Sequence, residues 1–218
     1  MKHAIRWAAA GLVLALLVTV AGCSLSNSPP VANFSWTPME PLARTEVRFE
    51  STSTDQGGLF GGGGIVTYDW DFDDGDSASN ADPKHEFDKS GDYDVTLTVT
   101  DGSAATASVT KRVEITPSLD GTWIGTIVAP GGATVGLQLR LSHSASGGIQ
   151  GNAQMINLQM PCDAISFNPT TGQIRLTLWD LRIRLDGTLD ASGTRIQGDW
   201  TDIPTGVVWW SWDVTLQN

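Results

Sequence analysis

The chain has 218 residues, a length that suggests one or two domains. Charged residues make up 17% of the sequence and hydrophobic residues 40%, and the formal net charge at pH 7 is −11. This acidic balance argues against a nucleic-acid-binding protein, because such proteins need a basic surface for the phosphate backbone. The two cysteines are too few for a disulfide framework or a cysteine-based zinc site.

The first 22 residues have the pattern of an export signal. Lys2 and Arg6 precede an apolar run over 8–21, whose fourteen residues are fewer than the roughly 20 of a membrane-spanning helix. The sequence VAGC at 20–23 resembles the lipobox of bacterial lipoproteins. That resemblance implies cleavage before Cys23 and attachment of a membrane lipid, with acyl chains such as palmitate, to the Cys23 thiol. An ordinary cleaved signal with an incidental cysteine and an uncleaved helical anchor are the alternatives.

Removal of residues 1–22 deletes two basic residues and no acidic ones. The mature chain then has 11 basic and 24 acidic residues, a net charge of −13. Membrane contact is therefore expected through the lipid on Cys23 rather than through charge, since each buried methylene contributes about 0.8 kcal/mol. Residues 23–30 are expected to form a tether. Ser24 after the cysteine resembles lipoproteins sorted to the outer membrane, so we expect a lipid-anchored protein of the bacterial cell envelope, on the outer membrane or cell surface.

From residue 29 onward the pattern predicts short β-strands and no long helix. Apolar and polar residues alternate over 45–50, 93–101 and 107–115, with Lys111 interrupting the third stretch. A further stretch, 66–72, places its large apolar residues on one face, namely Val66, Tyr68, Trp70 and Phe72. Such alternation between polar and glycine-rich turns is typical of antiparallel sheets packed face to face.

Residues 31–116 carry an ordered series of motifs. They contain YDWDFDDGDS at 68–77, then Pro83 and His85, then GDY at 91–93 and a strand that ends at Asp101. In this order the motifs resemble those of a PKD domain, although Asp73 and Phe87 stand where the family usually has glycine and tyrosine. The resemblance implies an immunoglobulin-like β-sandwich that mediates surface contacts with proteins or polysaccharides and carries no catalytic chemistry.

Five aspartates crowd the stretch 69–76. Counted from Asp69, an EF-hand loop needs glycine at position 6 and glutamate at position 12, but the chain has Asp74 and Asn80 there. We therefore predict no metal site and expect a solvated acidic face with a turn. A calcium site of another type, which the resemblance to PKD domains allows, stays open. His85 is expected to form structural hydrogen bonds rather than to act as a base.

A Thr-Pro-Ser sequence at 116–118 marks the expected domain boundary, and residues 117–218 form the expected second domain. Eight stretches of strand character, separated by short turns, lie at 121–128, 134–141, 148–155, 163–167, 173–179, 182–189, 194–201 and 207–216. This spacing predicts a small antiparallel up-and-down β-barrel. The strings Gly-Thr-Trp at 121–123 and Gly-Asp-Trp at 198–200 resemble lipocalin-like barrels. The expected fold class is thus all-β: an immunoglobulin-like sandwich followed by a barrel.

Six of the nine tryptophans fall in the second domain. Strand parity places Trp200, Trp210 and Trp212 on the inner face of the barrel and Trp209 on its outer face. The inner three are the candidate ligand-lining residues. A filled core is favoured over a pocket, because eight short strands leave room for side chains or at most one small ligand.

The sequence contains no recognisable catalytic or cofactor motif. His143 lacks a nucleophile-elbow serine, and Cys162 has no basic neighbour that would lower the pKa of its thiol. We therefore predict a non-enzymatic protein without a cofactor, which binds a protein or polysaccharide partner or acts as a scaffold. An accessory role in envelope polysaccharide hydrolysis and a small-ligand-binding barrel are the alternatives.

Overall fold

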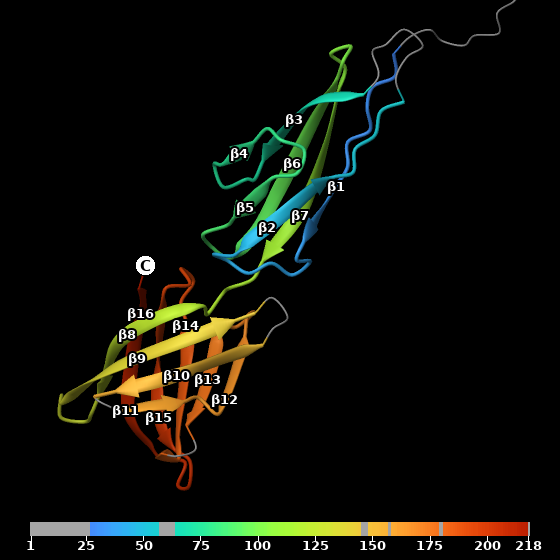
Figure 1. Ribbon diagram of the computed structural model, residues 1–218. Coiled ribbons are helices and arrows are strands. Elements are labelled where there is room, and N and C mark those ends of the chain that lie inside the picture. Colours follow the sequence, from blue (N-terminus) through green and yellow to red (C-terminus); the bar gives the residue numbers. More distant parts are fainter. Residues whose placement is uncertain (1–26, 57–63, 145–147, 157, 179–180, 218) are drawn as a thin grey trace, which may run out of the picture.

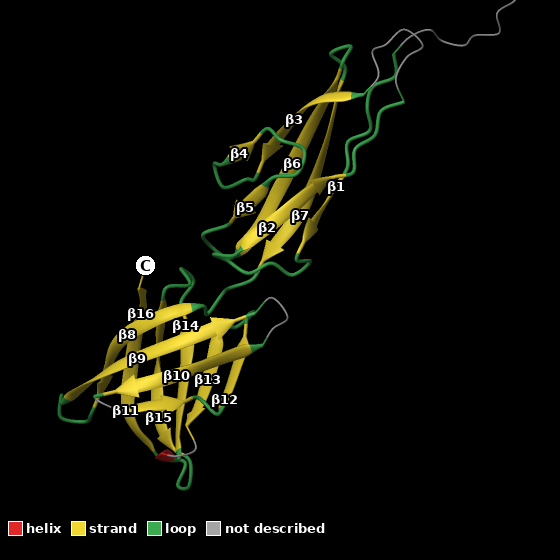
Figure 2. Cartoon of the chain, viewed as in Figure 1, coloured by secondary structure: helices red, strands yellow, loops and turns green. Residues whose placement is uncertain are grey.

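The computed structural model describes residues 27–56, 64–144, 148–156, 158–178 and 181–217 (Figure 1). The predicted signal peptide and Cys23 lie outside these residues. Apart from one short helical turn, the described chain consists of strands and loops (Figure 2), which confirms the all-β fold class. None of its helical residues forms a segment with the length and hydropathy of a membrane span.

The first unit is a β-sandwich of two antiparallel sheets, with strand orders β1-β2-β5 and β4-β3-β6-β7 (Figure 1). Its strands are β1 (Phe34–Thr37), β2 (Glu46–Ser51), β3 (Ile65–Asp71), β4 (Ser77–Ala78), β5 (Lys84–Glu86), β6 (Gly91–Asp101) and β7 (Thr106–Ile115). This arrangement is the predicted immunoglobulin-like sandwich.

Aromatic side chains fill the space between these two sheets. Trp70 is buried, and its ring centroid lies 5.1 Å from that of Phe34 and 5.6 Å from that of Phe49. The indole Nε1 of Trp70 donates to the carbonyl oxygen of Asn80 at 2.9 Å. The only polar atom of this large side chain is thus satisfied inside an apolar core.

Two details of the sandwich depart from simple alternation. The predicted inward position of Val66 is wrong: its side chain is 61% exposed, because the strand register shifts between Ile65 and Thr67. Lys111, which interrupts the alternation of β7, reaches across the edge of the sandwich. Its ammonium group donates to the carbonyl oxygen of Phe34 and lies 5.0 Å from the centroid of the Phe34 ring.

The second unit is one nine-stranded antiparallel sheet that curls on itself. Its strand order is β11-β10-β9-β8-β16-β15-β14-β13-β12. The strands are β8 (Gly121–Val128), β9 (Thr134–His143), β10 (Ile149–Met155), β11 (Leu158–Pro161), β12 (Ala164–Asn168), β13 (Gln173–Leu178), β14 (Ile183–Leu189), β15 (Arg195–Asp202) and β16 (Val208–Gln217). Eight of these correspond to the predicted stretches, and β11 is additional.

The sheet curls into a barrel with one open seam. The first and last strands of the unit, β8 and β16, pair with each other. Strands β11 and β12 do not pair, and the antiparallel ladders on either side make them run in the same direction. They are therefore two halves of one interrupted strand: β11 pairs with β10, and β12 pairs with β13. The change of partner takes place at Cys162, whose N–H donates to the Gly151 carbonyl, and Asp163, whose N–H donates to the Thr177 carbonyl.

The interior of the barrel is filled by side chains. Trp123 and Trp212 are its largest buried residues. The indole Nε1 of Trp123 donates to the Leu119 carbonyl at 2.9 Å, which fixes the chain just before the barrel over its upper end. Trp212 fits because Gly187 leaves room for it: a Cβ atom at residue 187 would lie 2.6 Å from Cζ2 of Trp212. Glycine in this strand is thus a packing requirement.

Two separate hydrophobic cores lie on either side of residues 116–118, the first ending at Ile115 and the second beginning at Leu119. The guanidinium group of Arg44 joins the two units, since it donates to the carbonyl of Ser118 at 2.8 Å and to that of Gly193 at 3.3 Å. At the other end of the sandwich, Asn27 donates to the buried carboxylate of Asp101. The chain therefore enters at the end of the molecule opposite the barrel (Figure 1).

Because Trp212 of β16 points inward and Trp209 points outward, we predict that replacing them lowers the stability of the protein by different amounts. Trp212→Ala should lower the free energy of unfolding by about 3–5 kcal/mol, because it removes a buried indole and leaves a cavity. Trp209→Ala should lower it by less than about 1 kcal/mol, because that side chain is 54% exposed. Urea denaturation of both variants measures the two values; similar losses for both would contradict the assignment of the faces.

Candidate functional site

The three tryptophans that the sequence offered as ligand-lining residues differ in burial: two are half-buried and one is fully buried. Trp200 and Trp210 face each other across β15 and β16, with ring centroids 5.3 Å apart and an angle of 45° between the rings. Both are half-buried at the end of the barrel that points away from the sandwich. Trp212 is 1% exposed and belongs to the core, so it does not line this surface. Trp209 lies beside the pair and is exposed.

Apolar side chains gather at the same end of the barrel. They lie where β10 ends, where β11, β14 and β16 begin, and in the adjoining loops, and the antiparallel order brings all these positions to one end. Their exposed fractions range from 38% to 75%. We define the distal rim as these exposed residues and the tryptophan pair: Ile156, Leu158, Leu181, Val207, Val208 and Trp209, with Trp200 and Trp210.

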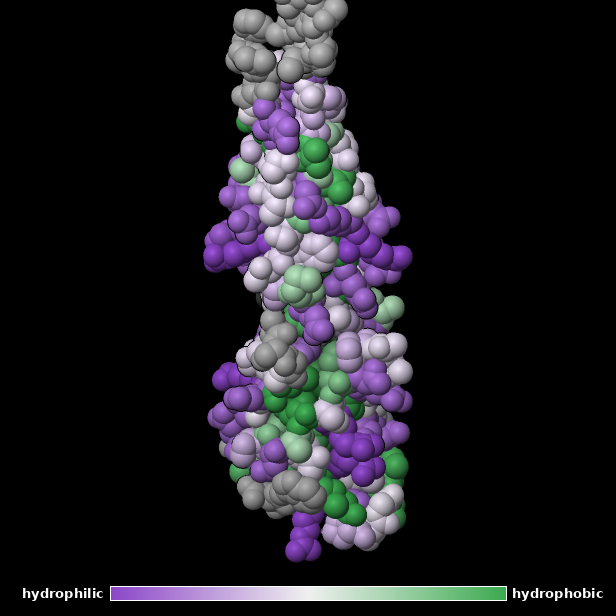
Figure 3. Space-filling view, turned by 90° about the vertical axis from the view of Figure 1, so that its right-hand side faces the viewer, coloured by the Kyte–Doolittle hydropathy of each residue, from purple (hydrophilic) through white to green (hydrophobic). Residues whose placement is uncertain are grey.

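The distal rim contains two shallow hollows on either side of Trp209. One, of about 150 Å³, is lined by Trp200, Asp202, Trp209 and Trp210. The other, of about 280 Å³, is lined by Val128, Ala129, Pro130, Asp199, Val208, Trp209, Trp210 and Ser211. Each hollow thus combines indole surface with one carboxylate. Apolar atoms reach the surface at this lower end of the molecule in Figure 3.

Sequence reasoning identified only part of the distal rim. The run VVWW at 207–210 contains a clear signal, because a strand with alternating faces cannot bury four successive apolar residues. The outward position of Trp209 follows from this. Ile156, Leu158 and Leu181 are isolated in the sequence, and only the folded barrel brings them to the same end as that run.

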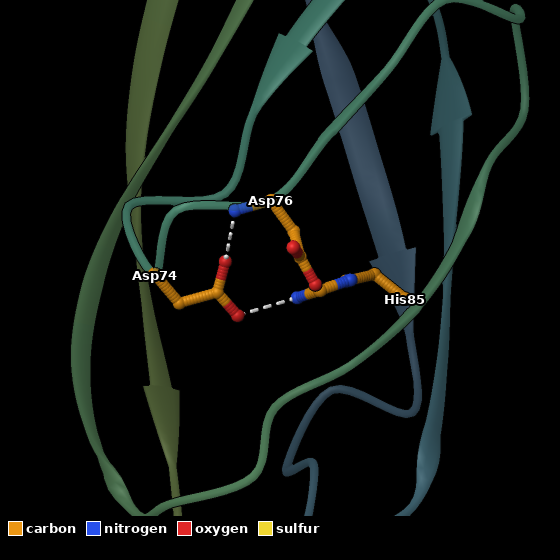
Figure 4. A group of neighbouring side chains, drawn as sticks. All are labelled: Asp74, Asp76 and His85. Atoms are coloured by element: carbon orange, nitrogen blue, oxygen red, sulfur yellow. Dashed lines mark hydrogen bonds and ion pairs between the residues drawn. The ribbon is translucent and has the colours of Figure 1, made fainter.

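The aspartate-rich turn of the first unit is organised by His85 (Figure 4). The Nε2 atom of His85 lies 2.7 Å from Oδ2 of Asp74, and its ring stacks on Phe72 with centroids 4.1 Å apart. The other carboxylate oxygen of Asp74 accepts the N–H of Asp76 at 3.1 Å. Asp73 adopts a φ of 64°, in the left-handed region where glycine and aspartate are tolerated. His85 thus has a structural role in holding this turn.

Asp74, Asp76 and His85 are the described residues that could hold a metal ion, since their ligand atoms lie within 4.8 Å of one another. Calcium takes six to eight oxygen ligands, whereas this group offers two carboxylates and a ring nitrogen. Both oxygens of Asp74 already have partners in the protein. The hydrogen bond between His85 and Asp74 therefore joins the turn to β5, and we assign no cation to this group.

His143 and Cys162 also have structural surroundings. The Nδ1 atom of His143 accepts the backbone N–H of Leu119 at 3.3 Å, and the backbone N–H of His143 donates to Oδ1 of Asp120 at 2.6 Å. Burial lowers the pKa of His143, and the nearby Asp120 carboxylate opposes this in part. Burial, together with Asp163, raises the pKa of the Cys162 thiol to about 11, so the thiol is protonated and unreactive at neutral pH.

The lowered pKa of His143 predicts that the folded protein loses stability in mild acid. The unfolded chain takes up a proton at this residue near pH 6.5, whereas the folded chain resists it, because a proton on Nδ1 would displace the N–H of Leu119. The free energy of unfolding should therefore fall as the pH drops below 6.5 toward the lower pKa of the folded state, and this group should have no effect above 6.5.

The control for this prediction is His143→Asn, whose side-chain oxygen can accept the same N–H without titrating. Urea denaturation between pH 5 and 8 should give a smaller pH dependence for this variant than for the wild type. The two proteins differ only at residue 143, so the comparison isolates the contribution of that side chain. Identical pH dependence in the two proteins would rule out His143 as the source.

Residues 27–117 match the family model of the PKD domain. The chain is 33% identical over 75 residues to collagenase ColA of Clostridium perfringens and 36% identical over 100 residues to the pre-pro-metalloprotease PrtV of Vibrio cholerae. These matches cover 34% and 45% of this chain but 6% and 10% of the relatives. The chain therefore spans a tenth or less of the length of these curated relatives.

Solved structures give similar matches. The PKD1 domain of Vibrio anguillarum Epp is 33% identical, with 41% of this chain and 96% of that domain covered and a TM-score of 0.36. The PKD1 domain of Vibrio cholerae PrtV is 34% identical, with 40% and 98% covered and a TM-score of 0.35. A structure of carbohydrate-binding modules from the beta-sandwich super family is 21% identical, with 88% and 86% covered and a TM-score of 0.38.

Proposed function

We propose that this chain, whose residues 27–117 form a PKD domain, is a lipid-anchored, non-enzymatic protein of the bacterial cell envelope that binds a partner protein through its distal rim. One observation carries the proposal: an indole that is 54% exposed, that of Trp209, lines both hollows of the distal rim together with Trp210. Exposed apolar surface of this kind marks interaction sites in soluble domains.

The position of the distal rim suits a protein tethered at its N-terminus. The chain enters at Asn27 on the far end of the sandwich, next to Asp101, and the distal rim lies at the opposite end of the molecule (Figure 1). A lipid on Cys23 would thus hold the sandwich near the membrane and leave the distal rim facing away from it. In this arrangement the PKD domain acts as a spacer, and Arg44 keeps the barrel attached in a defined orientation.

The chemistry of the distal rim favours a protein over a polysaccharide or a membrane. Five of its eight side chains are aliphatic, and they offer a sugar neither a flat ring nor a hydrogen bond. An anionic lipid surface would meet the net charge of −13 that the chain has without residues 1–22, and the carboxylates of Asp199 and Asp202. A protein with an apolar patch bordered by basic side chains matches both features. The names of the relatives, collagenase and metalloprotease, refer to protein substrates.

The alternative of a small ligand inside the barrel finds no support among the described residues. Trp123 and Trp212 occupy the interior together with the aliphatic side chains of the core. An accessory role in polysaccharide hydrolysis would require sugar binding, which the experiment on the distal rim also measures.

The lipid anchor predicts the behaviour of Cys23→Ser. Without the thiol no diacylglyceryl group can be attached, so the variant should remain uncleaved or appear in the soluble fraction. Membrane fractionation of cells that express the wild type and the variant, combined with metabolic labelling by an alkyne analogue of palmitate, measures this. A Cys23→Ser variant that is processed and still firmly membrane-bound would contradict the anchor.

The distal rim predicts where the partner protein binds. A photo-crosslinking amino acid at position 209 should form an adduct with one protein in cells that express the chain natively. The same amino acid at position 66, which is exposed on the sandwich, is the matched control and should not form that adduct. With the purified partner, Trp209→Ala should weaken binding by about 30-fold, which corresponds to about 2 kcal/mol for a central tryptophan.

Two results would exclude a protein partner at the distal rim. One is the same set of adducts from positions 209 and 66. The other is a shift of the intrinsic tryptophan fluorescence on addition of a neutral hexasaccharide or of phosphatidylglycerol vesicles, abolished by Trp209→Ala. These would assign the surface to sugars or to lipids.

A further inference from the structure

The outer wall of the barrel carries a hollow of about 480 Å³, which is separate from the two hollows of the distal rim. Residues of four adjacent strands line it, namely β12, β13, β14 and β15 (Figure 1). Because neighbouring strands lie about 4.8 Å apart, the hollow extends about 14 Å across the sheet. A ligand that fills it is therefore elongated and lies across the strands.

Polar side chains border this hollow in two rows. Strand register places four of them opposite one another in the first row: Ser166, Arg175, Asp186 and Asp199. In the second row, Gln173 of β13 faces Thr188 of β14. These side chains point outward, because they alternate along their strands with residues that face the core. The two rows thus offer hydrogen-bonding groups at regular intervals.

Bare backbone lies between the two rows. Gly187 and Gly198 face each other there, and both line the hollow. A Cβ atom at residue 198 would lie 1.8 Å from the carbonyl oxygen of Asp186, so the two strands approach each other more closely than a side chain would allow. Glycine within a strand permits such an approach and lets a ligand come close to the backbone.

Two of the charged groups in the first row are held in place by the protein. One carboxylate oxygen of Asp186 accepts the Nε–H of Arg175 at 2.6 Å, and the other accepts the Nε–H of Arg184 at 2.5 Å. Arg175 uses only its Nε–H in this contact, so its terminal amino groups stay available for a ligand. A fixed guanidinium group loses less freedom when it binds, which favours affinity.

The charges of the hollow select against an acidic ligand. Its lining contains one cation, Arg175, and two carboxylates, those of Asp186 and Asp199. An acidic ligand would meet a net negative surface. A ligand rich in hydroxyl groups suits the lining, because a hydroxyl can donate to a carboxylate and accept from a guanidinium or amide group.

We propose that this hollow binds a segment of a neutral polysaccharide. The polar rows supply hydrogen bonds to the sugar hydroxyls, and the glycine backbone between them lets the chain lie close to the sheet. The site is distinct from the distal rim, whose aliphatic surface suits a protein, and the inference goes beyond the protein binding proposed for that surface. It adds a second ligand class on a different wall of the barrel.

The first test locates the site without any change to the barrel. The full chain carrying Cys23→Ser is mixed with unbranched neutral hexasaccharides of glucose, galactose, mannose, xylose or N-acetylglucosamine, each at about 1 mM. Backbone amide signals are followed by nuclear magnetic resonance. At least one hexasaccharide should shift the signals of Gly187 and Gly198, and that of Gly136, on β9 outside the hollow, should stay unchanged.

The second test changes the side chains that would contact the sugar. Gln173 and Asp199 are exposed, so the double variant Gln173→Ala/Asp199→Ala should fold normally and weaken binding of the identified hexasaccharide at least about tenfold. The matched control is Gln159→Ala/Asp69→Ala, which alters exposed residues of β11 and β3 and should bind like the parent. Trp209→Ala should also bind like the parent, which separates this site from the distal rim.

Three results would overturn the proposal. The first is that no neutral hexasaccharide shifts the signals of Gly187 and Gly198. The second is equal affinity of the parent and the Gln173→Ala/Asp199→Ala variant, or a loss of binding in Trp209→Ala, which would move the sugar to the distal rim. The third is a galacturonic acid hexasaccharide that binds as tightly as the neutral one, since the carboxylates of the hollow should repel it.

Discussion

The narrow interior of the barrel is the constraint on which the arrangement of the second unit depends. It holds two indoles, those of Trp123 and Trp212, and the second fits only because residue 187 is glycine. Once these side chains fill the interior, the remaining described tryptophans of the unit lie at its end. Trp200 and Trp210 are half-buried against the end of this core, and Trp209 is exposed beside them. A filled barrel thus directs any binding function to its outside.

The surfaces of the sandwich and of the distal rim have different chemistry for physical reasons. In the sandwich, aspartates serve local structure: they accept backbone N–H groups in turns, and Asp74 holds His85. At the far end, the distal rim exposes aliphatic and indole surface that no described residue covers. An isolated domain would be more soluble without that surface, so its presence favours a binding role.

The seam shows how a barrel can close without a complete ladder. One interrupted strand changes partner at Cys162 and Asp163. Its first half, β11, pairs with β10 on one side of the seam, and its second half, β12, pairs with β13 on the other side. As a result, one edge of β12 has no ladder partner within the described chain. The distal rim follows from another consequence of this fold, an apolar end that stays unburied.

The sequence by itself determined the all-β class and eight of the nine strands of the second unit, because alternation and turn residues are local signals. The PKD domain was identified through the resemblance of its ordered motifs to that family. It also determined that Trp209 points outward and Trp212 inward. Only the tertiary structure decided that Val66 turns outward at a register shift, that Leu158–Pro161 forms a strand, and that Ile156, Leu158 and Leu181 join the tryptophans. These features depend on which strands become neighbours, and pairing between residues far apart in the chain leaves no periodic signal in either partner.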